Sequence, residues 1–324
     1  MSNFNSFLKA KGLLLFMAIA LAGSIAAIIV LSIALGKAGG RARSLKIENS
    51  QLGSQITNLS SASRSGEEAD DQEFFRRDFV SHKDGMPDSY LLVPPKQQPL
   101  SNKYTLIVYL HGMGSNYLEP YVVANKTPIA PAIREAFPSA VIASLNYRRS
   151  NAWGNELALA DINQNITEIS YTYPLESIIV MGTSMGGSVA LNYPAVAPDA
   201  IRDKIRGVVS VEGTGDLAEL FRKTKVDVVR LGVAEAMGGA PEQTPENYKK
   251  SSLLQHIEQL PKAISFAIVS AKKDKTVPPV LQKDAAAALE KNGFRCRLTE
   301  IDLDHEFPDP QVYVDALKFV VQNR

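Results

Sequence analysis

Ser184 lies at the centre of the segment GTSMG, residues 182–186, where a glycine stands two positions away on each side. An apolar run, SIIVM, precedes the segment and a helical pattern follows it. In a strand–turn–helix of this kind, a G-x-S-x-G sequence holds the serine in a tight turn, and the flanking glycines avoid clashes with the neighbouring strand and helix. The first turn of the helix adds amide N–H groups and positive potential. The pattern therefore predicts a nucleophilic serine, provided that a base can take its proton.

Two later loops supply a base and an acid in the order that such a serine needs. Asp274 follows the apolar run ISFAIVSA, and His305 follows RLTEIDL. A histidine can accept the serine proton if a carboxylate fixes its tautomer and supports its positive charge. We therefore predict the catalytic set Ser184, Asp274 and His305.

Other acids and histidines fit these roles less well. Asp302 and Asp304 lie very near His305 in the chain, and Glu212, at the end of VVSVE, is a less favoured substitute for Asp274. His256 precedes the acid and is typical of a histidine on a helix face.

An oxyanion formed at the acyl carbon needs hydrogen-bond donors that are already in place. The backbone N–H of Met185, directly after the serine, is one predicted donor. The second should come from LHGMGSN, which follows the run YTLIVY. We expect the N–H of Met113, or alternatively that of Gly112, to donate, and His111 to brace the loop.

Competing interpretations of the glycine-rich loops fail on single residues. The GMGSNY segment lacks the third glycine of a dinucleotide fingerprint, because Tyr117 occupies that position. GTSMGGS lacks the G-K-[ST] ending of a phosphate loop. The four histidines are scattered and Cys296 is the only cysteine, so we expect neither a metal site nor a cofactor.

Strand and helix patterns alternate from residue 74 to the end of the chain. This alternation predicts an α/β domain, residues 74–324, with a mostly parallel, doubly wound sheet. The first strands form an antiparallel hairpin with KDGMPD as its turn. Residues 214–262 separate two strands by far more than a crossover requires, which predicts a helical insertion. We expect this insertion and the loop 148–156, which carries Trp153, to line the substrate pocket.

The N-terminal part of the chain has a different character. Residues 1–11 form a short tail, and residues 12–36 contain an uncharged apolar stretch long enough to span a bilayer. The stretch is too long for the apolar region of a cleaved signal peptide. We expect a signal anchor that places the rest of the chain outside the cytoplasm, although basic residues flank both ends and the positive-inside rule is slightly contrary. The polar segment 37–73 is a linker, in which leucines every seven residues could form a short self-associating stalk at 45–59.

The bulk composition limits the classes of partner. Of the 324 residues, 45% are hydrophobic and 21% charged, as in ordinary globular proteins, and the formal net charge is +1. This balance gives no reason to expect nucleic acid.

The quoted motifs resemble those of the α/β-hydrolase superfamily, over residues 75–324. GTSMGG, LHGMGSN, KKDKTVPP and DLDHEFPD carry the resemblance. LNYRRSNAWG is similar to a loop of the prolyl oligopeptidase-type branch, except that Arg149 stands where a glycine is usual. The resemblance implies a serine hydrolase that cleaves small carboxylic esters without a cofactor, and the apolar stretch near the N-terminus adds that it is membrane-anchored. A serine peptidase or amidase with the same triad, or a non-catalytic binding protein of this fold, are the alternatives.

Overall fold

The computed structural model describes residues 74–121 and 128–322. The chain divides into two units, Met1–Gln72 and Glu73–Arg324, and the helices and strands given below all belong to the second. The predicted anchor, linker and stalk fall outside the described residues. Within the described ranges, no helix has both the length and the hydropathy that crossing a bilayer requires.

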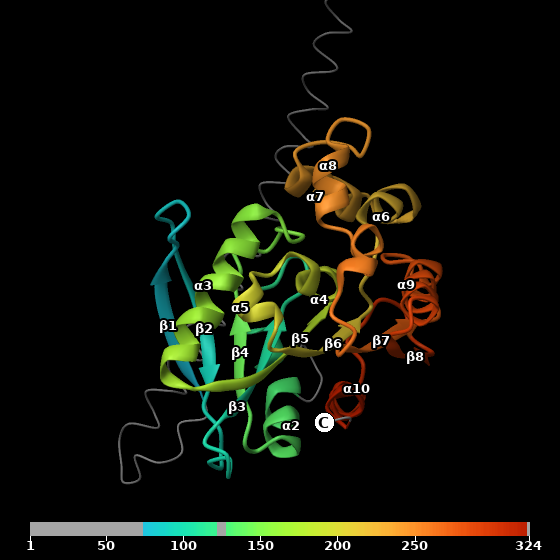
Figure 1. The fold of residues 1–324 in the computed structure, drawn as a ribbon. Helices are drawn as coiled ribbons and strands as arrows, with labels where there is room; N and C mark the ends of the chain where they lie inside the picture. The colour runs from blue at the N-terminus through green and yellow to red at the C-terminus, as the bar shows by residue number, and fades with distance from the viewer. Residues whose placement is uncertain (1–73, 122–127, 323–324) are drawn as a thin grey trace, which may run out of the picture. The chain divides into compact units, whose positions relative to one another are not determined.

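An eight-stranded sheet forms the centre of the second unit (Figure 1). Its strands lie in the order β1-β2-β4-β3-β5-β6-β7-β8. β1 and β2 pair antiparallel, as do β2 and β4, whereas the remaining pairs are parallel. The mostly parallel sheet and its leading hairpin are therefore confirmed. The strands are β1 Phe75–Val80, β2 Pro87–Val93, β3 Tyr104–Leu110, β4 Val141–Leu145, β5 Leu175–Thr183, β6 Ile205–Val211, β7 Ser265–Ala271 and β8 Arg295–Ile301.

Helices cover both faces of the sheet (Figure 1). They are α2 Ile129–Ala136, α3 Glu156–Thr172, α4 Met185–Val196, α5 Asp199–Arg202, α6 Leu217–Lys223, α7 Asp227–Met237, α8 Pro245–Lys250, α9 Pro279–Lys291 and α10 Pro310–Val321, with short 3-10 helices η1 Glu119–Tyr121, η2 Leu253–Gln255 and η3 Ile257–Gln259.

The alternation of side chains along each strand divides the core into two clusters. In β3, Leu106, Val108 and Leu110 belong to a cluster that also contains residues of α3, α4 and α9, whereas Ile107 and Tyr109 belong to a cluster with residues of α2 and α10. Successive residues of a strand point to opposite faces, so a sheet covered on both sides needs apolar residues at every position. This explains why the central strands are continuous apolar runs.

The segment predicted as an insertion contains α6, α7 and α8 and the 3-10 helices η2 and η3, between β6 and β7. Asp216 begins α6 by accepting the Glu219 N–H, and Gly238 ends α7 in a left-handed conformation with φ of 80°. In Figure 1, α6, α7 and α8 stand beyond the end of the sheet at which α4 begins. The insertion also reaches the loop after β3, since Gly232 of α7 lies against the Met113 side chain.

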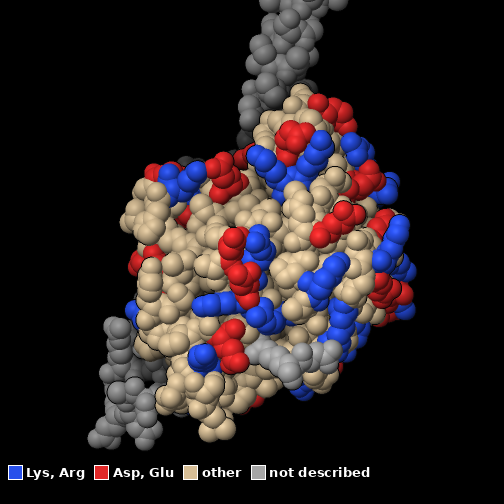
Figure 2. All heavy atoms as spheres, viewed as in Figure 1, with Lys and Arg blue, Asp and Glu red and all other residues tan. Residues whose placement is uncertain are grey.

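Basic and acidic side chains are interspersed on the face of the molecule drawn in Figure 2. The insertion carries exposed ion pairs, such as Arg222 with Glu219 and Lys249 with Glu246. Exposed pairs of this kind contribute little to stability. No large patch of one sign is visible on this face.

Candidate active site

Ser184 occupies a strained turn between β5 and α4. Its backbone has φ of 56° and ψ of −115°, a region that residues with side chains rarely adopt. The turn brings its backbone so close to the end of β3 that the two flanking positions have no room for side chains. A Cβ atom on Gly182 would lie 2.7 Å from the Leu110 carbonyl oxygen, and one on Gly186 would lie 2.7 Å from the His111 carbonyl oxygen. Both glycines are thus required by close approach to the end of β3.

The structure brings Ser184, His305 and Asp274 into one hydrogen-bonded chain. Ser184 Oγ lies 2.9 Å from His305 Nε2, and Asp274 Oδ2 lies 2.7 Å from His305 Nδ1. His305 keeps 22% of its side chain exposed, whereas the Asp274 carboxylate is buried. In the tautomer that this geometry favours, Nδ1–H donates to the carboxylate and Nε2 accepts the serine proton.

Asp274 is held rigidly by the loop that follows β7. Its Oδ1 accepts the backbone N–H groups of Thr276 and Val277, both at 2.8 Å. The Gln282 amide approaches Oδ2 at 3.4 Å. The backbone bonds use one carboxylate oxygen and leave the other directed at His305, which fixes the orientation of the ring.

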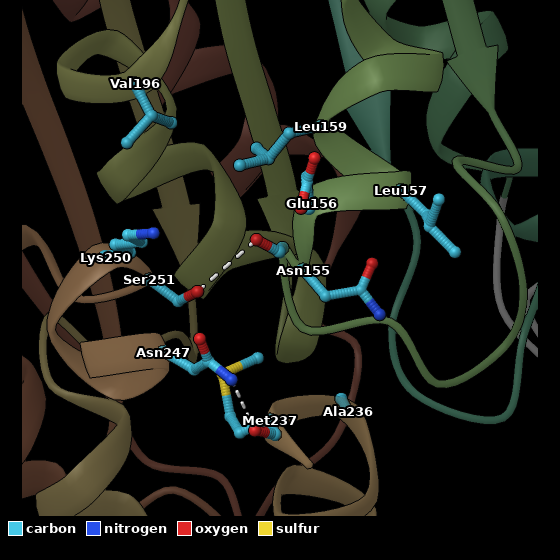
Figure 3. A pocket seen from close by; sticks show the side chains of 11 residues that line it. Asn155, Glu156, Leu157, Leu159, Val196, Ala236, Met237, Asn247, Lys250 and Ser251 are labelled. Atoms are coloured by element: carbon cyan, nitrogen blue, oxygen red, sulfur yellow. Dashed lines mark hydrogen bonds between the residues drawn. The ribbon is translucent and has the colours of Figure 1, made fainter. Parts of the chain in front are cut away.

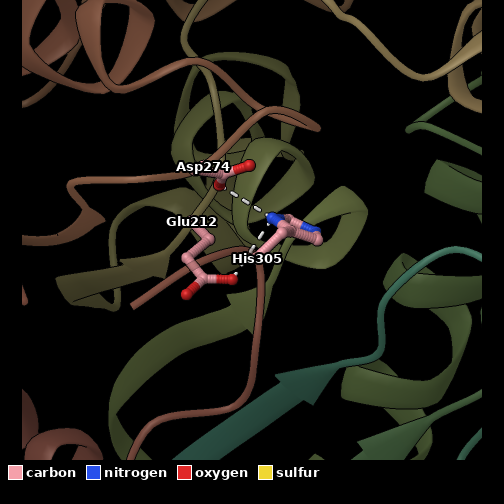
Figure 4. A group of neighbouring side chains, drawn as sticks. All are labelled: Glu212, Asp274 and His305. Atoms are coloured by element: carbon pink, nitrogen blue, oxygen red, sulfur yellow. Dashed lines mark hydrogen bonds and ion pairs between the residues drawn. The ribbon is translucent and has the colours of Figure 1, made fainter. Parts of the chain in front are cut away.

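Glu212 also reaches His305, from the end of β6. Its Oε2 lies 3.3 Å from the same Nδ1 atom, and Figure 4 shows both carboxylates directed at this edge of the imidazole. One oxygen of Glu212, one oxygen of Asp274 and one ring nitrogen of His305 lie within 4.8 Å of one another, and atoms of these types can bind a metal ion. Because His305 and Asp274 also form the hydrogen-bonded series that begins at Ser184, we assign this group to proton transfer.

The remaining candidate acids and the other histidine lie elsewhere. Asp302 pairs with Lys273 at 3.1 Å, and Asp304 is exposed. His256 Nε2 contacts the Lys249 carbonyl oxygen at 2.9 Å. None of these contacts reaches Ser184 or His305.

His111 is buried at the base of the predicted oxyanion loop. Its Nδ1 lies 2.8 Å from the Gly112 carbonyl oxygen and its Nε2 lies 3.0 Å from that of Asn146. The Tyr147 hydroxyl donates to the His111 carbonyl at 2.6 Å. Burial lowers the pKa of His111, so the neutral ring is favoured. These contacts join the loop to the end of β4, in agreement with a bracing residue.

Glu119 is a buried acid that the sequence patterns did not single out. Its Oε2 accepts the Gly112 N–H at 2.9 Å, and its Oε1 accepts the Tyr109 hydroxyl at 2.8 Å. Burial raises the pKa of Glu119 to about 7. Glu119 begins the 3-10 helix η1, in a segment with no motif of its own, and only the folded contacts reveal it.

The Gly112 bond corrects the alternative assignment of the second oxyanion donor. Since the Gly112 N–H already donates to Glu119, it is not directed at a substrate bound to Ser184. The Gly114 N–H donates to the Ser150 carbonyl at 2.7 Å. The amides on both sides of Met113 are therefore engaged within the protein.

Trp153 lies inside the core, with 1% of its surface exposed. Its indole N–H donates to Asn151 at 2.9 Å, and its backbone φ of 48° places it in a strained loop. The expectation that it contacts substrate is not matched by its exposure. The loop itself is fixed by Arg148, whose guanidinium forms a 3.0 Å ion pair with the buried Asp161.

The insertion and the 148–156 loop do meet in a pocket, of about 450 Å³. Figure 3 shows Asn155 and Glu156 near the start of α3 facing Met237, Asn247 and Ser251 of the insertion. Ser184, His305 and Asp274 do not line this pocket. The predicted lining segments are thus neighbours, but the pocket between them is lined by Val196, at the end of α4 opposite to Ser184, and does not include the nucleophile.

Comparisons with known proteins agree with this architecture. The family model described as alpha/beta hydrolase fold matches residues 105–236. No curated protein matches the chain.

Several solved structures resemble the chain at low identity. Pyrococcus horikoshii acylaminoacyl peptidase has a TM-score of 0.58 and 16% identity, over 78% of this chain and 41% of its own. A puromycin-hydrolyzing peptidase of Mycobacterium tuberculosis has a TM-score of 0.57 and 18% identity, over 76% of this chain and 40% of its own. The S-formylglutathione hydrolase FrmB of Staphylococcus aureus has a TM-score of 0.56 and 14% identity, over 77% of this chain and 97% of its own.

The chain spans about two fifths of the length of the two peptidases, so these similarities concern the fold. The strand order and the serine turn between β5 and α4 point in the same direction. The second unit of this chain therefore has the α/β-hydrolase fold, and its resemblance to that superfamily is confirmed.

Proposed function

We propose that this protein is a serine hydrolase that cleaves carboxylic esters through an acyl-enzyme. The observation that carries the proposal is the chain of contacts from Ser184 Oγ to His305 Nε2, at 2.9 Å, and from His305 Nδ1 to Asp274 Oδ2, at 2.7 Å. A nucleophile, a base and an orienting acid within hydrogen-bond reach form the arrangement that acyl transfer requires.

In the first half of the reaction, Ser184 Oγ bonds to the acyl carbon while His305 takes the serine proton. His305 then gives that proton to the departing alcohol, and the acyl group stays on Ser184. In the second half, His305 removes a proton from water, the water oxygen attacks the acyl carbon, and Ser184 regains its proton as the acid leaves. Asp274 supports the positive charge on His305 in both halves.

We assign the oxyanion donors to the backbone N–H groups of Met185 and Met113. Met185 is the first residue of α4, where amide groups lack partners within the helix. Met113 lies between two residues whose amides are used by Glu119 and Ser150. This leaves Met113 as the loop amide available to a substrate oxygen.

A serine peptidase or amidase is the second candidate, and the two peptidases among the similar structures favour it. FrmB, which this chain covers almost completely in length, is named for hydrolysis of S-formylglutathione, a thioester and not an amide, and so favours the ester class of reaction over the amide class. The same triad serves both reactions, so the substrate must decide. We also propose that residues 12–36 anchor the enzyme in a membrane, with the catalytic unit on the extracytoplasmic side.

The deciding experiment compares p-nitrophenyl esters of increasing acyl length with matched anilides, for wild type and Ser184→Ala. We expect ester turnover to exceed anilide turnover, and Ser184→Ala to lose at least about 10³-fold in kcat, since a triad nucleophile is removed. Ser170→Ala, in α3, is the control and should behave as wild type. A fluorophosphonate should label wild type and fail to label Ser184→Ala. Wild-type turnover in Ser184→Ala refutes the mechanism, and faster anilide turnover favours the peptidase.

A further inference from the structure

Glu212 is placed where a second acid for His305 would have to be. It is 1% exposed, directly after β6, and its Oε2 lies 3.3 Å from His305 Nδ1. Asp274 reaches the same nitrogen from the end of the neighbouring strand β7, at 2.7 Å. Figure 4 shows the two carboxylates on the same side of the ring, away from the edge that carries Nε2. A single N–H group thus faces two carboxylates.

The backbone holds Glu212 in this position at a conformational cost. Its φ of 55° is rare for a residue with a side chain. The Glu212 N–H donates to the Val269 carbonyl at 2.8 Å, which extends the pairing of β6 with β7. The next residue, Gly213, approaches the start of α4 so closely that a Cβ atom would lie 2.6 Å from the Ser188 nitrogen. The position of the carboxylate is therefore tied to the turn that positions Ser184.

The charges around His305 give this position a function. A buried carboxylate is unfavourable unless it is hydrogen-bonded or faces a positive charge. During acyl transfer His305 becomes positively charged, and Glu212 and Asp274 are the acids that contact it. On the histidine's own loop, Asp302 is paired with Lys273 and Asp304 is exposed. Two carboxylates beside one imidazolium stabilise it more than one does.

We propose that Glu212 is a second acid for His305, a positioning residue that shares the Nδ1–H group with Asp274 and can hold the same tautomer when Asp274 is neutralised. The shorter contact and the two backbone bonds make Asp274 the principal acid. The proposal rests on the serine hydrolase function proposed above. It adds that neutralising Asp274 lowers activity less here than neutralising the acid does in a triad that has only one.

The test measures kcat/KM for a short acyl aryl ester from pH 5 to 9 in wild type, Asp274→Asn, Glu212→Gln and the double variant. Loss of the acid from a triad that has only one lowers kcat by about 10⁴-fold. We expect Asp274→Asn to lose only about 10²-fold and the double variant to lose about 10⁴-fold, because only the double variant lacks both acceptors.

The pH profile separates a role in proton transfer from a purely structural role. Glu212→Gln removes a negative neighbour of the imidazolium, so the acid limb of its kcat/KM profile should move to lower pH. Asp304→Asn, which alters an exposed acid of the same loop, should leave both the rate and the acid limb unchanged. A structural defect in Glu212→Gln would lower the rate or the melting temperature without moving the acid limb.

The proposal is overturned if Asp274→Asn is as inactive as the double variant, or if the acid limb of Glu212→Gln coincides with that of wild type. If Glu212→Gln does not fold, Asp274→Asn decides alone, since a loss of about 10⁴-fold would mean that nothing replaces Asp274. The nucleophile is tested separately by Ser184→Ala. If Ser184→Ala and Asp274→Asn are both inactive, only the role proposed for Glu212 is refuted. If Ser184→Ala is active, the hydrolase mechanism itself is refuted.

Discussion

At the scale of single residues, buried acids distinguish this site more than its triad does. Asp274 and Glu212 converge on one nitrogen of His305, and Glu119 lies beneath the oxyanion loop. Glu119 accepts the Gly112 N–H and the Tyr109 hydroxyl, and Tyr109 in turn contacts Thr183, the residue before the nucleophile. Ionisation of the Glu119 carboxyl in so enclosed a position raises the free energy of the folded state.

This environment makes stability depend on pH. The pKa of Glu119 is raised by burial from 4.5 to about 7, so the folded protein keeps a proton that the unfolded chain releases. Below pH 4.5, Glu119 is protonated in both the folded and the unfolded state and does not change the free energy of unfolding. That free energy falls as the pH rises from 4.5 towards 7. At about 1.4 kcal/mol per pKa unit, the loss is on the order of 3 kcal/mol.

Glu119→Gln, which resembles the protonated acid, should remove this loss. Urea unfolding at pH 4.5, 6 and 8 measures the free energy of unfolding of both proteins, and their difference should grow with pH in favour of the variant. Glu258→Gln, at an exposed acid, should show no such trend. A difference that does not change with pH would show that Glu119 does not take up a proton on folding.

At the scale of elements, the contact between α7 and the oxyanion loop couples the insertion to the site. A Cβ atom on Gly232, in the middle of α7, would lie 2.8 Å from Met113 Sδ and 2.9 Å from Asn151 Oδ1. Asn151 also donates to Glu235 of α7 at 3.0 Å. The helix thus rests on the residue whose amide we assign to the oxyanion, and the absence of a side chain at position 232 permits the approach.

Gly232→Ala should therefore lower catalysis rather than improve stability. Alanine in a helix interior is normally favoured over glycine by up to about 1 kcal/mol, but here the methyl group must displace Met113 or α7. We expect kcat/KM for the ester to fall about tenfold or more, because small displacements of catalytic groups are costly. Leu231→Ala changes the adjacent side chain, which is 69% exposed, and should alter the rate by less than about twofold. Equal rates for Gly232→Ala and wild type would contradict the coupling.

At the scale of the whole molecule, the chain combines a catalytic unit, Glu73–Arg324, with an N-terminal region of very different composition. The uncharged apolar residues from Leu13 to Leu35 are the basis for the proposed anchor. If the anchor serves only to locate the enzyme, catalysis by the second unit should not depend on it.

We expect the full chain to remain with membranes after washing with high salt and alkaline carbonate, and to be released by detergent. A chain that begins at Glu73 should stay in the supernatant with unchanged kcat/KM. Deletion of residues 37–72 alone keeps the anchor and should leave the protein in the membrane fraction. Recovery of the full chain in the supernatant without detergent would refute the anchor.

The sequence by itself determined the alternation of strands and helices, the turn at Ser184, and the strand-end positions of Asp274 and His305. These features depend on local periodicity, on glycines at fixed spacing and on chain order, all of which are visible along the chain. Because parallel strands present their carboxyl ends at one edge of a sheet, local assignments were enough to place the three residues together.

Only the tertiary structure decided which acids face His305, which amides remain for the oxyanion and what Trp153 does. Glu212 follows a strand much as Asp274 does, and no spacing rule could tell that both reach one nitrogen. Glu119, at the start of η1, accepts the Gly112 N–H, and Trp153 is enclosed by the core. These outcomes depend on distances between side chains from separate elements, which are set by packing and cannot be derived from the order of residues alone.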